Sequence, residues 1–236
     1  MNKRVVINYI TQTAVFGGLA AILYCVPGLQ FQLPFVAPGF MSVHLDDIPI
    51  LISSLAYGPL LGIFELILKT LIKLPMTSTL CVGELGDLMY SLALIIPASW
   101  IYQKHRTFKG ALVGIGIGLI ANLFFTTVIN LYTIFPFYKS LYGMEDGTIA
   151  GMFGSIFGWD IKNDYDIRIA VLLLPFNLIK DAIVIGATLI AYKPLRFLLE
   201  KIYKYWKVIF YKIKQSSRGF WPLSHHRTYG LPYTAV

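Results

Sequence analysis

The 236-residue sequence is 56% hydrophobic and only 14% charged, and its mean hydropathy is +0.66. Soluble domains carry about a quarter charged residues, so this composition excludes a soluble globular protein. The net charge of +8 at pH 7 would suit a nucleic-acid partner, but the cations are clustered rather than spread along the chain. We therefore expect a protein that works in a membrane and does not bind nucleic acid.

Six apolar runs predict an all-α integral membrane protein with six transmembrane helices. The first run follows Lys3 and Arg4 and lacks a small-residue cleavage site, so it is expected to remain as a span. The second and third are short and meet at Tyr57-Gly58-Pro59, which predicts a tight turn. The six runs cover residues 5–26, 47–57, 59–73, 85–103, 110–135 and 169–192.

The segment 27–45, between the first two runs, breaks helices yet is apolar. It contains Pro27, Pro34 and Pro38, which exclude a regular helix, together with large side chains such as Phe31. Such a segment is expected to form a structured outer loop that packs over another part of the molecule.

The distribution of lysine and arginine predicts the orientation. Of the 20 cations, five lie in residues 1–4 and 104–109 and nine lie after residue 192, a set of segments with Glu200 as its one acid. Because cytoplasmic segments carry the excess of lysine and arginine, both termini are expected in the cytoplasm, with the protein in the plasma membrane. Loops 27–45, 74–84 and 136–168 then face outward.

The C-terminal region has a pattern of its own. Basic residues such as Lys204 and Lys207 fall on one side of a helix, with apolar residues such as Trp206 and Ile209 opposite. Such a helix lies on the inner leaflet and is attracted by anionic membrane lipid. We therefore expect a membrane domain over residues 1–195 and a basic amphipathic cytoplasmic tail over 196–236.

Ionisable side chains inside apolar spans are costly, so each is a candidate functional group. Glu65 and Lys69 stand four residues apart and can pair on one helix face, with Lys73 one turn further and able to reach outward. Glu84 and Asp87 begin the fourth run on a shared face, but they are equally well explained as charges favoured by the helix dipole.

Amides accompany these charges at membrane depth. Asn177 and Lys180 share one face of the last span, and Pro175 is expected to allow a local break just before them. Asn122 and Asn130 occupy the fifth run. Such amides either bind a polar ligand or hydrogen-bond neighbouring helices, and the sequence leaves both explanations open.

No enzymatic constellation is visible. The sequence contains no phosphate-binding loop, metalloprotease motif or serine-hydrolase motif, so it predicts no ATPase and no catalytic residue. Cys25 and Cys81 lack the spacing of metal ligands, and neither a metal nor a cofactor is expected.

Four blocks stand out by their order and spacing: Leu45-Asp46-Asp47-Ile48-Pro49, Tyr57-Gly58-Pro59-Leu60-Leu61-Gly62, Glu65-Leu66-Ile67-Leu68-Lys69 and Gly83-Glu84-Leu85-Gly86-Asp87. Together they resemble the substrate-binding S components of energy-coupling factor (ECF) vitamin transporters. A fifth block, Pro175-Phe176-Asn177-Leu178-Ile179-Lys180, is most similar to the riboflavin-specific members. The resemblance extends over about residues 10–195.

The resemblance implies six helices, a vitamin bound near the outer face under the first loop, and assembly with a transmembrane coupling protein and two ATPase subunits. It implies docking through small residues of the first helix, here Ala14 and Gly18, with Gly17 and Ala21 beside them. The family usually has alanine at both docking positions, so Gly18 is a departure. Small residues at this spacing also permit ordinary packing within the bundle.

By matching motif positions, the resemblance also implies the substrate-binding residues. A flavin offers a flat apolar face together with a polar edge of carbonyls and an N–H, which amides and an ammonium can bind. The ribityl hydroxyls suit carboxylates. The implied residues are Asn130, Asn177 and Lys180, with Glu84 and Asp87 as polar contacts and Met41 in the covering loop.

The sequence thus predicts a riboflavin-capturing S component and not an enzyme. One alternative is the same role with another vitamin or with a flavin such as FMN. A second is a membrane hydrolase that uses Glu84 and Asp87, and a third is a lipid-surface scaffold that acts through the basic tail.

Overall fold

The structure is a computed structural model that describes residues 3–39, 41–77, 79–164, 168–169 and 171–191. The chain divides into two compact units, Met1–Lys193 and Pro194–Val236. The second unit, and with it the predicted amphipathic tail, lies outside the described residues. The fold below is that of the first unit.

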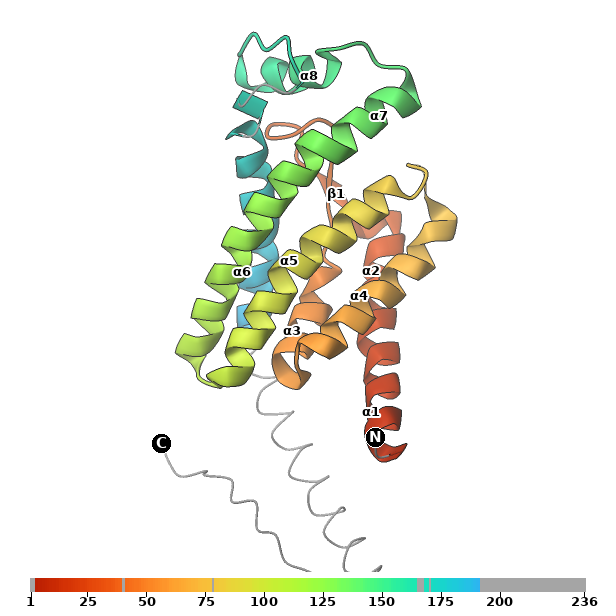
Figure 1. The fold of residues 1–236 in the computed structure, drawn as a ribbon, viewed down its shortest axis with the longest axis vertical. Coiled ribbons are helices and arrows are strands. Elements are labelled where there is room, and N and C mark those ends of the chain that lie inside the picture. Colours follow the sequence, from red (N-terminus) through yellow and green to blue (C-terminus); the bar gives the residue numbers. More distant parts are fainter. Residues whose placement is uncertain (1–2, 40, 78, 165–167, 170, 192–236) are drawn as a thin grey trace, which may run out of the picture. The chain divides into compact units, whose positions relative to one another are not determined.

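The described chain is built mainly from helices, which confirms the all-α membrane fold (Figure 1). Among the described residues, three helices are long and apolar enough to cross a membrane: Val82–Lys104, Phe108–Tyr142 and Val171–Ala191. The remaining apolar helices are shorter, so the count of six spans stays a prediction. In chain order the helices are α1 (Lys3–Gln12), a π-helical segment (Thr13–Gly17), α2 (Gly18–Cys25), α3 (Asp47–Tyr57), α4 (Pro59–Lys73), α5 (Val82–Lys104), α6 (Phe108–Ile129), a second π-helical segment (Asn130–Ile134), α7 (Phe135–Tyr142), α8 (Thr148–Phe157) and the last helix, Val171–Ala191.

The predicted tight turn between α3 and α4 is present. Gly58 has φ 111° and ψ 166°, a conformation that residues with a side chain rarely adopt, and its N–H donates to the Ser54 carbonyl at 2.8 Å. Pro59 then begins α4, where its missing N–H is tolerated.

The structured loop predicted between the first two apolar runs is also present, and it joins α2 to α3. A 3-10 turn (Pro27–Leu29) leads into a two-stranded antiparallel hairpin, β1 (Phe31–Gln32) and β2 (Ser42–Val43), in which Phe31 pairs with Val43. Val36, Ala37 and Val43 bury their side chains against Phe176 of the last helix. We call residues 26–46 the covering loop.

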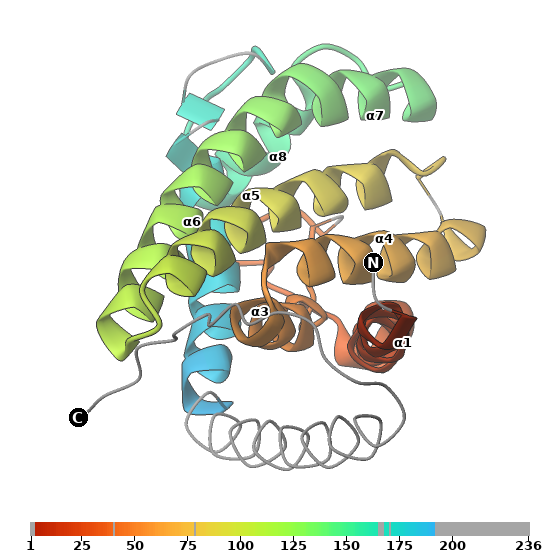
Figure 2. The ribbon, with the colours of Figure 1, turned by 60° about the horizontal axis from the view of Figure 1, so that its bottom comes forward.

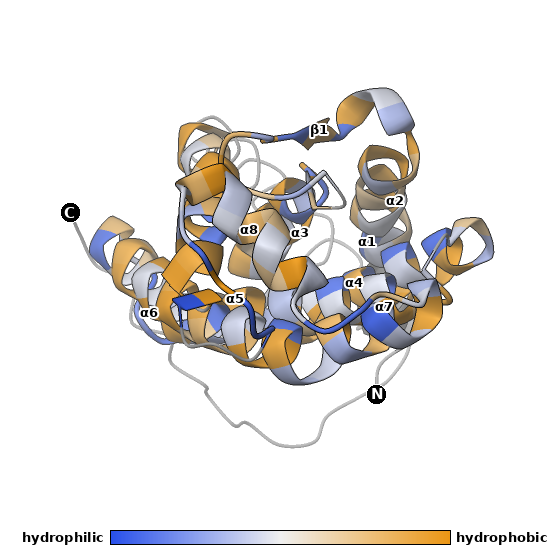
Figure 3. Ribbon diagram, turned by 90° about the horizontal axis from the view of Figure 1, so that it is seen from above, coloured by the Kyte–Doolittle hydropathy of each residue, from blue (hydrophilic) through white to orange (hydrophobic). Residues whose placement is uncertain are grey.

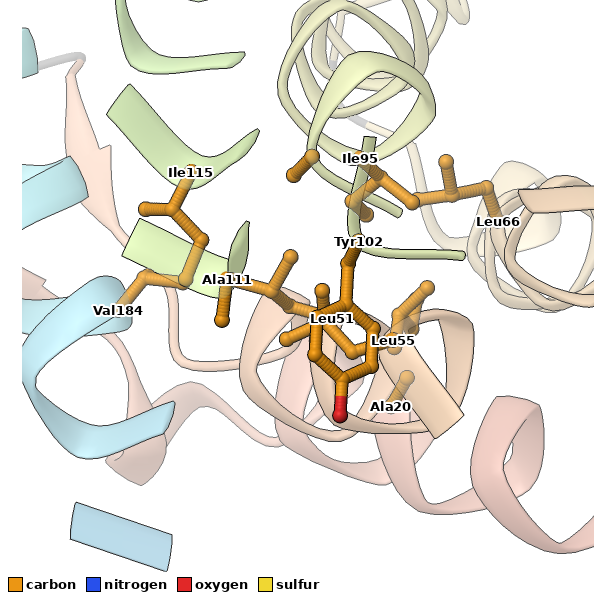
Figure 4. Packing of buried hydrophobic residues seen from close by; sticks show 11 residues of the cluster. Ala20, Leu51, Leu55, Leu66, Ile95, Tyr102, Ala111, Ile115 and Val184 are labelled. Carbon is orange, nitrogen blue, oxygen red and sulfur yellow. The ribbon is translucent and has the colours of Figure 1, made fainter. Parts of the chain in front are cut away.

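The hydrophobic core is shared by six helices. In Figure 4, Leu51 and Leu55 of α3 pack with Ile95 and Tyr102 of α5. Val184 of the last helix belongs to the same cluster. Helix α5 lies between α4 and α6 in both ribbon views (Figures 1 and 2). This arrangement makes α5 the central helix of the described bundle.

Two expectations about helix ends were wrong. The loop predicted over 136–168 begins later, because the helix of the fifth run continues through Pro136 to Tyr142 and is followed by α8. The π-helical turn at Asn130–Ile134 accommodates a proline that lacks an N–H donor. The break expected at Pro175 is also absent, since residues 171–191 are helical throughout.

Candidate functional site

A cavity of about 230 Å³ lies at the end of the bundle that carries the covering loop. Figure 3 looks onto this end, where β1, α7 and α8 lie. The walls of the cavity come from the ends of α2 and α4, the covering loop, the start of α5, the junction of α6 and α7, and the last helix. Residues far apart in the sequence therefore meet around one space.

All six residues that the sequence analysis assigned to substrate binding line this cavity. They come from the covering loop, α5, the second π-helical segment and the last helix. Their roles in binding stay predictions, but their convergence on one cavity is a result of the fold. The six are Met41, Glu84, Asp87, Asn130, Asn177 and Lys180.

A buried cluster of charges stands behind one wall. The Lys69 ammonium donates to Asp46, to Asp47 Oδ1 at 2.9 Å and to Asp87 Oδ2 at 3.1 Å. Lys180 donates to the other oxygen of Asp87 at 3.2 Å. Buried charges require such partners, because removal from water disfavours the ionised form.

The expected pairing of Glu65 with Lys69 was therefore wrong. Lys69 turns to three aspartates, and Glu65 accepts a hydrogen bond from Ser53 of α3. Lys73, expected to reach outward, lines the cavity with its ammonium 5.2 Å from the Tyr24 ring centroid. Spacing along one helix could not reveal partners supplied by other elements.

The second acidic residue of the cavity, Glu84, is held by the turn that precedes α5. Its Oε2 accepts hydrogen bonds from the hydroxyls of Thr77 at 2.8 Å and Thr79 at 2.9 Å. Thr79 Oγ1 also accepts from the Gly83 N–H at 3.2 Å. The carboxylate is thus oriented before any ligand arrives, and a helix-dipole role does not account for these contacts.

The asparagines divide into two groups. Asn130 and Asn177 line the cavity, and each donates to a main-chain carbonyl one turn earlier on its own helix, at 2.8 and 2.9 Å. Asn122 instead donates to Asp181 at 2.7 Å and joins α6 to the last helix. Asn122 is therefore an intramembrane amide that hydrogen-bonds a neighbouring helix.

Several cavity residues were missed by sequence reasoning. Tyr24, Tyr90, Tyr138 and Phe176 line the cavity and supply flat apolar surface, and His44 lies on the covering loop beside Tyr24 with ring centroids 4.9 Å apart. In a sequence with 15 tyrosines and 16 phenylalanines an aromatic residue alone is no signal. The position of His44 just before the Leu45–Pro49 block was the one available hint.

The four small residues predicted near the docking face point in different directions. Ala14 and Gly17 lie in the first π-helical segment, and Gly18 and Ala21 lie in α2. A side chain at Gly17 would meet Leu68 Cδ2 at 3.0 Å, and Ala21 is buried, so both serve packing against the bundle. Ala14 is exposed, and a side chain at Gly18 would meet nothing within 4 Å. The structure therefore leaves Ala14 and Gly18 on an open face of the helix.

The site offers carboxylates, amides and ammonium groups, but no metal centre. Within the described part of the chain, no three His, Cys, Asp or Glu residues are grouped so as to hold a metal ion. Glu84 and Asp87, the pair of the hydrolase alternative, are each engaged by partners of their own. The arrangement is suited to holding a polar, partly aromatic molecule.

The chain is similar in sequence and in fold to known proteins. Residues 8–192 match the family described as "ECF transporter, substrate-specific component". Riboflavin transporter RibU of Staphylococcus aureus strain TCH60 is 23% identical over 184 residues, which are 78% of this chain and 89% of the relative. Riboflavin transporter FmnP of Bacillus subtilis strain 168 is 23% identical over 184 residues, which are 74% of this chain and 86% of the relative.

A solved structure shares the fold. It is described as the S component of a bacterial ECF transporter, and it superposes with a TM-score of 0.63 at 21% identity over 81% of this chain and 97% of the other. The similar proteins are named transporters and not enzymes. The chain belongs to the family of substrate-specific components of ECF transporters, and is therefore a membrane transport subunit and not an enzyme.

Proposed function

We propose that this protein captures riboflavin from outside the cell for import by an ECF transporter. The observation that carries the proposal is the convergence of six residues, implied by resemblance to riboflavin-specific members, on one cavity under the covering loop. The names of the similar transporters support the same substrate.

The cavity has the chemistry that a flavin requires. Tyr90, Tyr138 and Phe176 supply surface for the isoalloxazine ring, and the side chains of Asn177 and Lys180 suit its carbonyl and N–H edge. The oriented carboxylate of Glu84 suits the ribityl hydroxyls, because charged acceptors form the stronger hydrogen bonds.

The substrate test is a titration with riboflavin. The protein is purified in detergent without added ligand, its absorbance is recorded at flavin wavelengths, and quenching of riboflavin fluorescence is followed. We expect co-purified flavin or saturable quenching, with Kd raised roughly 10- to 100-fold by Lys180→Ala or Asn177→Ala, because each removes one or two polar contacts. Lys162→Ala is the control, since that side chain is 85% exposed.

A folded, colourless protein that does not quench riboflavin fluorescence would refute the substrate. A panel with FMN and other vitamins would then identify the alternative within the family.

The proposed transport cycle uses a plasma-membrane protein with both termini in the cytoplasm, a transmembrane coupling protein and two ATPases. ATP hydrolysis in those partners drives inward release. The open face of the first helix at Ala14 and Gly18 supports docking there, since a helix can approach closely where side chains are small.

Docking is tested with Gly18→Leu. We expect riboflavin binding to persist while co-purification with the coupling protein is lost. Gly116→Leu on α6, also in open space, is the matched control and should assemble normally. Equal assembly of both variants would exclude this face as the docking site.

A further inference from the structure

We propose that Lys69, which does not line the cavity, is a positioning residue for ligand binding: it holds Asp87 so that the Lys180 ammonium stays directed at the cavity. The inference rests on the proposed riboflavin binding at this cavity. Lys69 itself does not line the cavity, but it contacts two residues that do, Asp87 and Tyr24.

Lys69 is enclosed within the bundle. Its side chain is fully buried on α4 and bonds carboxylates from two other elements: Asp46 and Asp47 at the junction of the covering loop and α3, and Asp87 on α5. Ser91 donates to both oxygens of Asp47 at 2.8 Å, which orients that carboxylate toward Lys69. The ammonium is therefore held on several sides.

Asp87 is shared between two lysines, Lys69 and Lys180. Its Oδ2 accepts from Lys69 at 3.1 Å and its Oδ1 accepts from Lys180 at 3.2 Å. Because each oxygen has its own cation, Asp87 cannot turn to bind Lys180 with both. Without Lys69, the buried Asp87 charge would draw the Lys180 ammonium toward itself and away from a ligand.

The Lys69 ammonium also binds the end of the covering loop, through Asp46. Ser42 and His44 line the cavity, and Asp46 lies two residues after His44. Lys69 thus anchors the end of the covering loop and the wall of the cavity through one buried charge. Loss of that charge is expected to affect binding through both contacts, with the Asp87 to Lys180 connection dominant because it leads directly to a ligand contact.

A purely structural role for Lys69 makes a different prediction, and Glu65 provides the comparison. Glu65 lies one turn earlier on α4, is equally buried, and bonds Ser53 rather than Asp87. A change at Glu65 should therefore lower stability without changing the affinity of the folded protein.

The test is a double-mutant cycle on riboflavin Kd, measured by fluorescence quenching of the full chain in detergent. Lys180→Met is expected to raise Kd roughly 10- to 100-fold, and Lys69→Met about tenfold. In the Lys180→Met background, Lys69→Met should raise Kd by less than about threefold, since its effect runs through Lys180. Glu65→Ala should lower the melting temperature, because it removes a buried side chain and its hydrogen bond with Ser53, and should leave Kd within about twofold.

An equal effect of Lys69→Met in both backgrounds would overturn the proposal while leaving riboflavin binding intact. A wild-type protein that fails to bind riboflavin would refute the proposed function and this inference together. If Lys69→Met does not fold, the cycle is repeated in an Asp46→Asn background, which leaves one buried carboxylate fewer without a cation. Non-additivity there supports the proposal, and additivity again overturns it.

Discussion

Individual polar residues in this bundle are held by partners from other elements before any ligand binds. Glu84 is fixed by two threonine hydroxyls, and Asp87 is divided between two lysines. Side chains that are already oriented lose less conformational entropy when a ligand binds. The threonines and lysines that hold Glu84 and Asp87 should therefore influence affinity as well as folding.

Replacing Thr79 by valine should weaken riboflavin binding. The hydroxyl that donates to Glu84 and accepts from Gly83 is lost while the shape is kept, and we expect Kd to rise roughly 3- to 10-fold. Thr188→Val is the matched control, because the structure records no partner for that buried hydroxyl within the described chain. A quenching titration of both variants checks this, and equal Kd values would contradict it.

His44 should make the protein less stable in acid. Burial lowers the pKa of His44 to about 4, against the opposing attraction of Asp87, whereas the unfolded chain has a pKa near 6.5. Between these values the unfolded state binds more protons, so stability falls as pH drops from about 6.5 to 4, by roughly 3 kcal/mol at most.

Thermal melting of wild type and His44→Phe at pH 7.5 and pH 5 isolates this effect from the titration of the aspartates. The loss of stability on acidification should be smaller in His44→Phe. An identical loss in the two proteins would show that the imidazole does not contribute.

At the scale of elements, close helix contacts position the walls of the cavity. Helix α6 approaches α5 through glycines: a side chain at Gly114 would lie 2.6 Å from the Ala98 carbonyl, and one at Gly118 would lie 2.4 Å from the Leu94 carbonyl. Backbone atoms cannot move aside easily, so this approach depends on the absence of a Cβ atom.

Gly118→Ala should therefore separate α5 from α6 and destabilise the protein by roughly 1–3 kcal/mol. Gly116→Ala, two residues earlier, meets nothing within 4 Å and should leave the melting temperature unchanged or raise it. Melting curves in the same detergent compare the two. Equal melting temperatures would contradict the close approach of α5 and α6.

At the scale of the whole molecule, parts of the chain that do not line the cavity pack against parts that do. Asp164 accepts from the Gly147 and Ala150 N–H groups at 3.0 and 2.8 Å and so caps the start of α8. Phe153 of α8 is buried beside the last helix, and Met41 of the covering loop packs against the same cluster. The order of α8 is thus connected to the order of the covering loop.

Asp164→Ala should remove this cap, loosen α8 by about 1–2 kcal/mol and accelerate riboflavin dissociation several-fold. Asp160→Ala, whose side chain is 81% exposed, is the control. Stopped-flow displacement measures both dissociation rates. Unchanged dissociation from Asp164→Ala would show that α8 does not help to retain the ligand.

The sequence by itself was enough for the membrane class, the helical segments, the glycine turn at Gly58 and the structured loop, because hydropathy, proline and glycine act locally. The recognisable blocks contain four of the six residues assigned to substrate binding, Glu84, Asp87, Asn177 and Lys180, since each block is a short continuous segment.

Only the tertiary structure decided which residues pair. Lys69 bonds Asp46, Asp47 and Asp87 instead of Glu65, and Gly17 packs inward while Gly18 stays open, although each alternative fits the helical spacing. The structure likewise extended the fifth helix through Pro136, where a π-helical turn accommodates the missing donor. Spacing along one helix limits what a side chain can reach, whereas its partner is set by the elements packed against it.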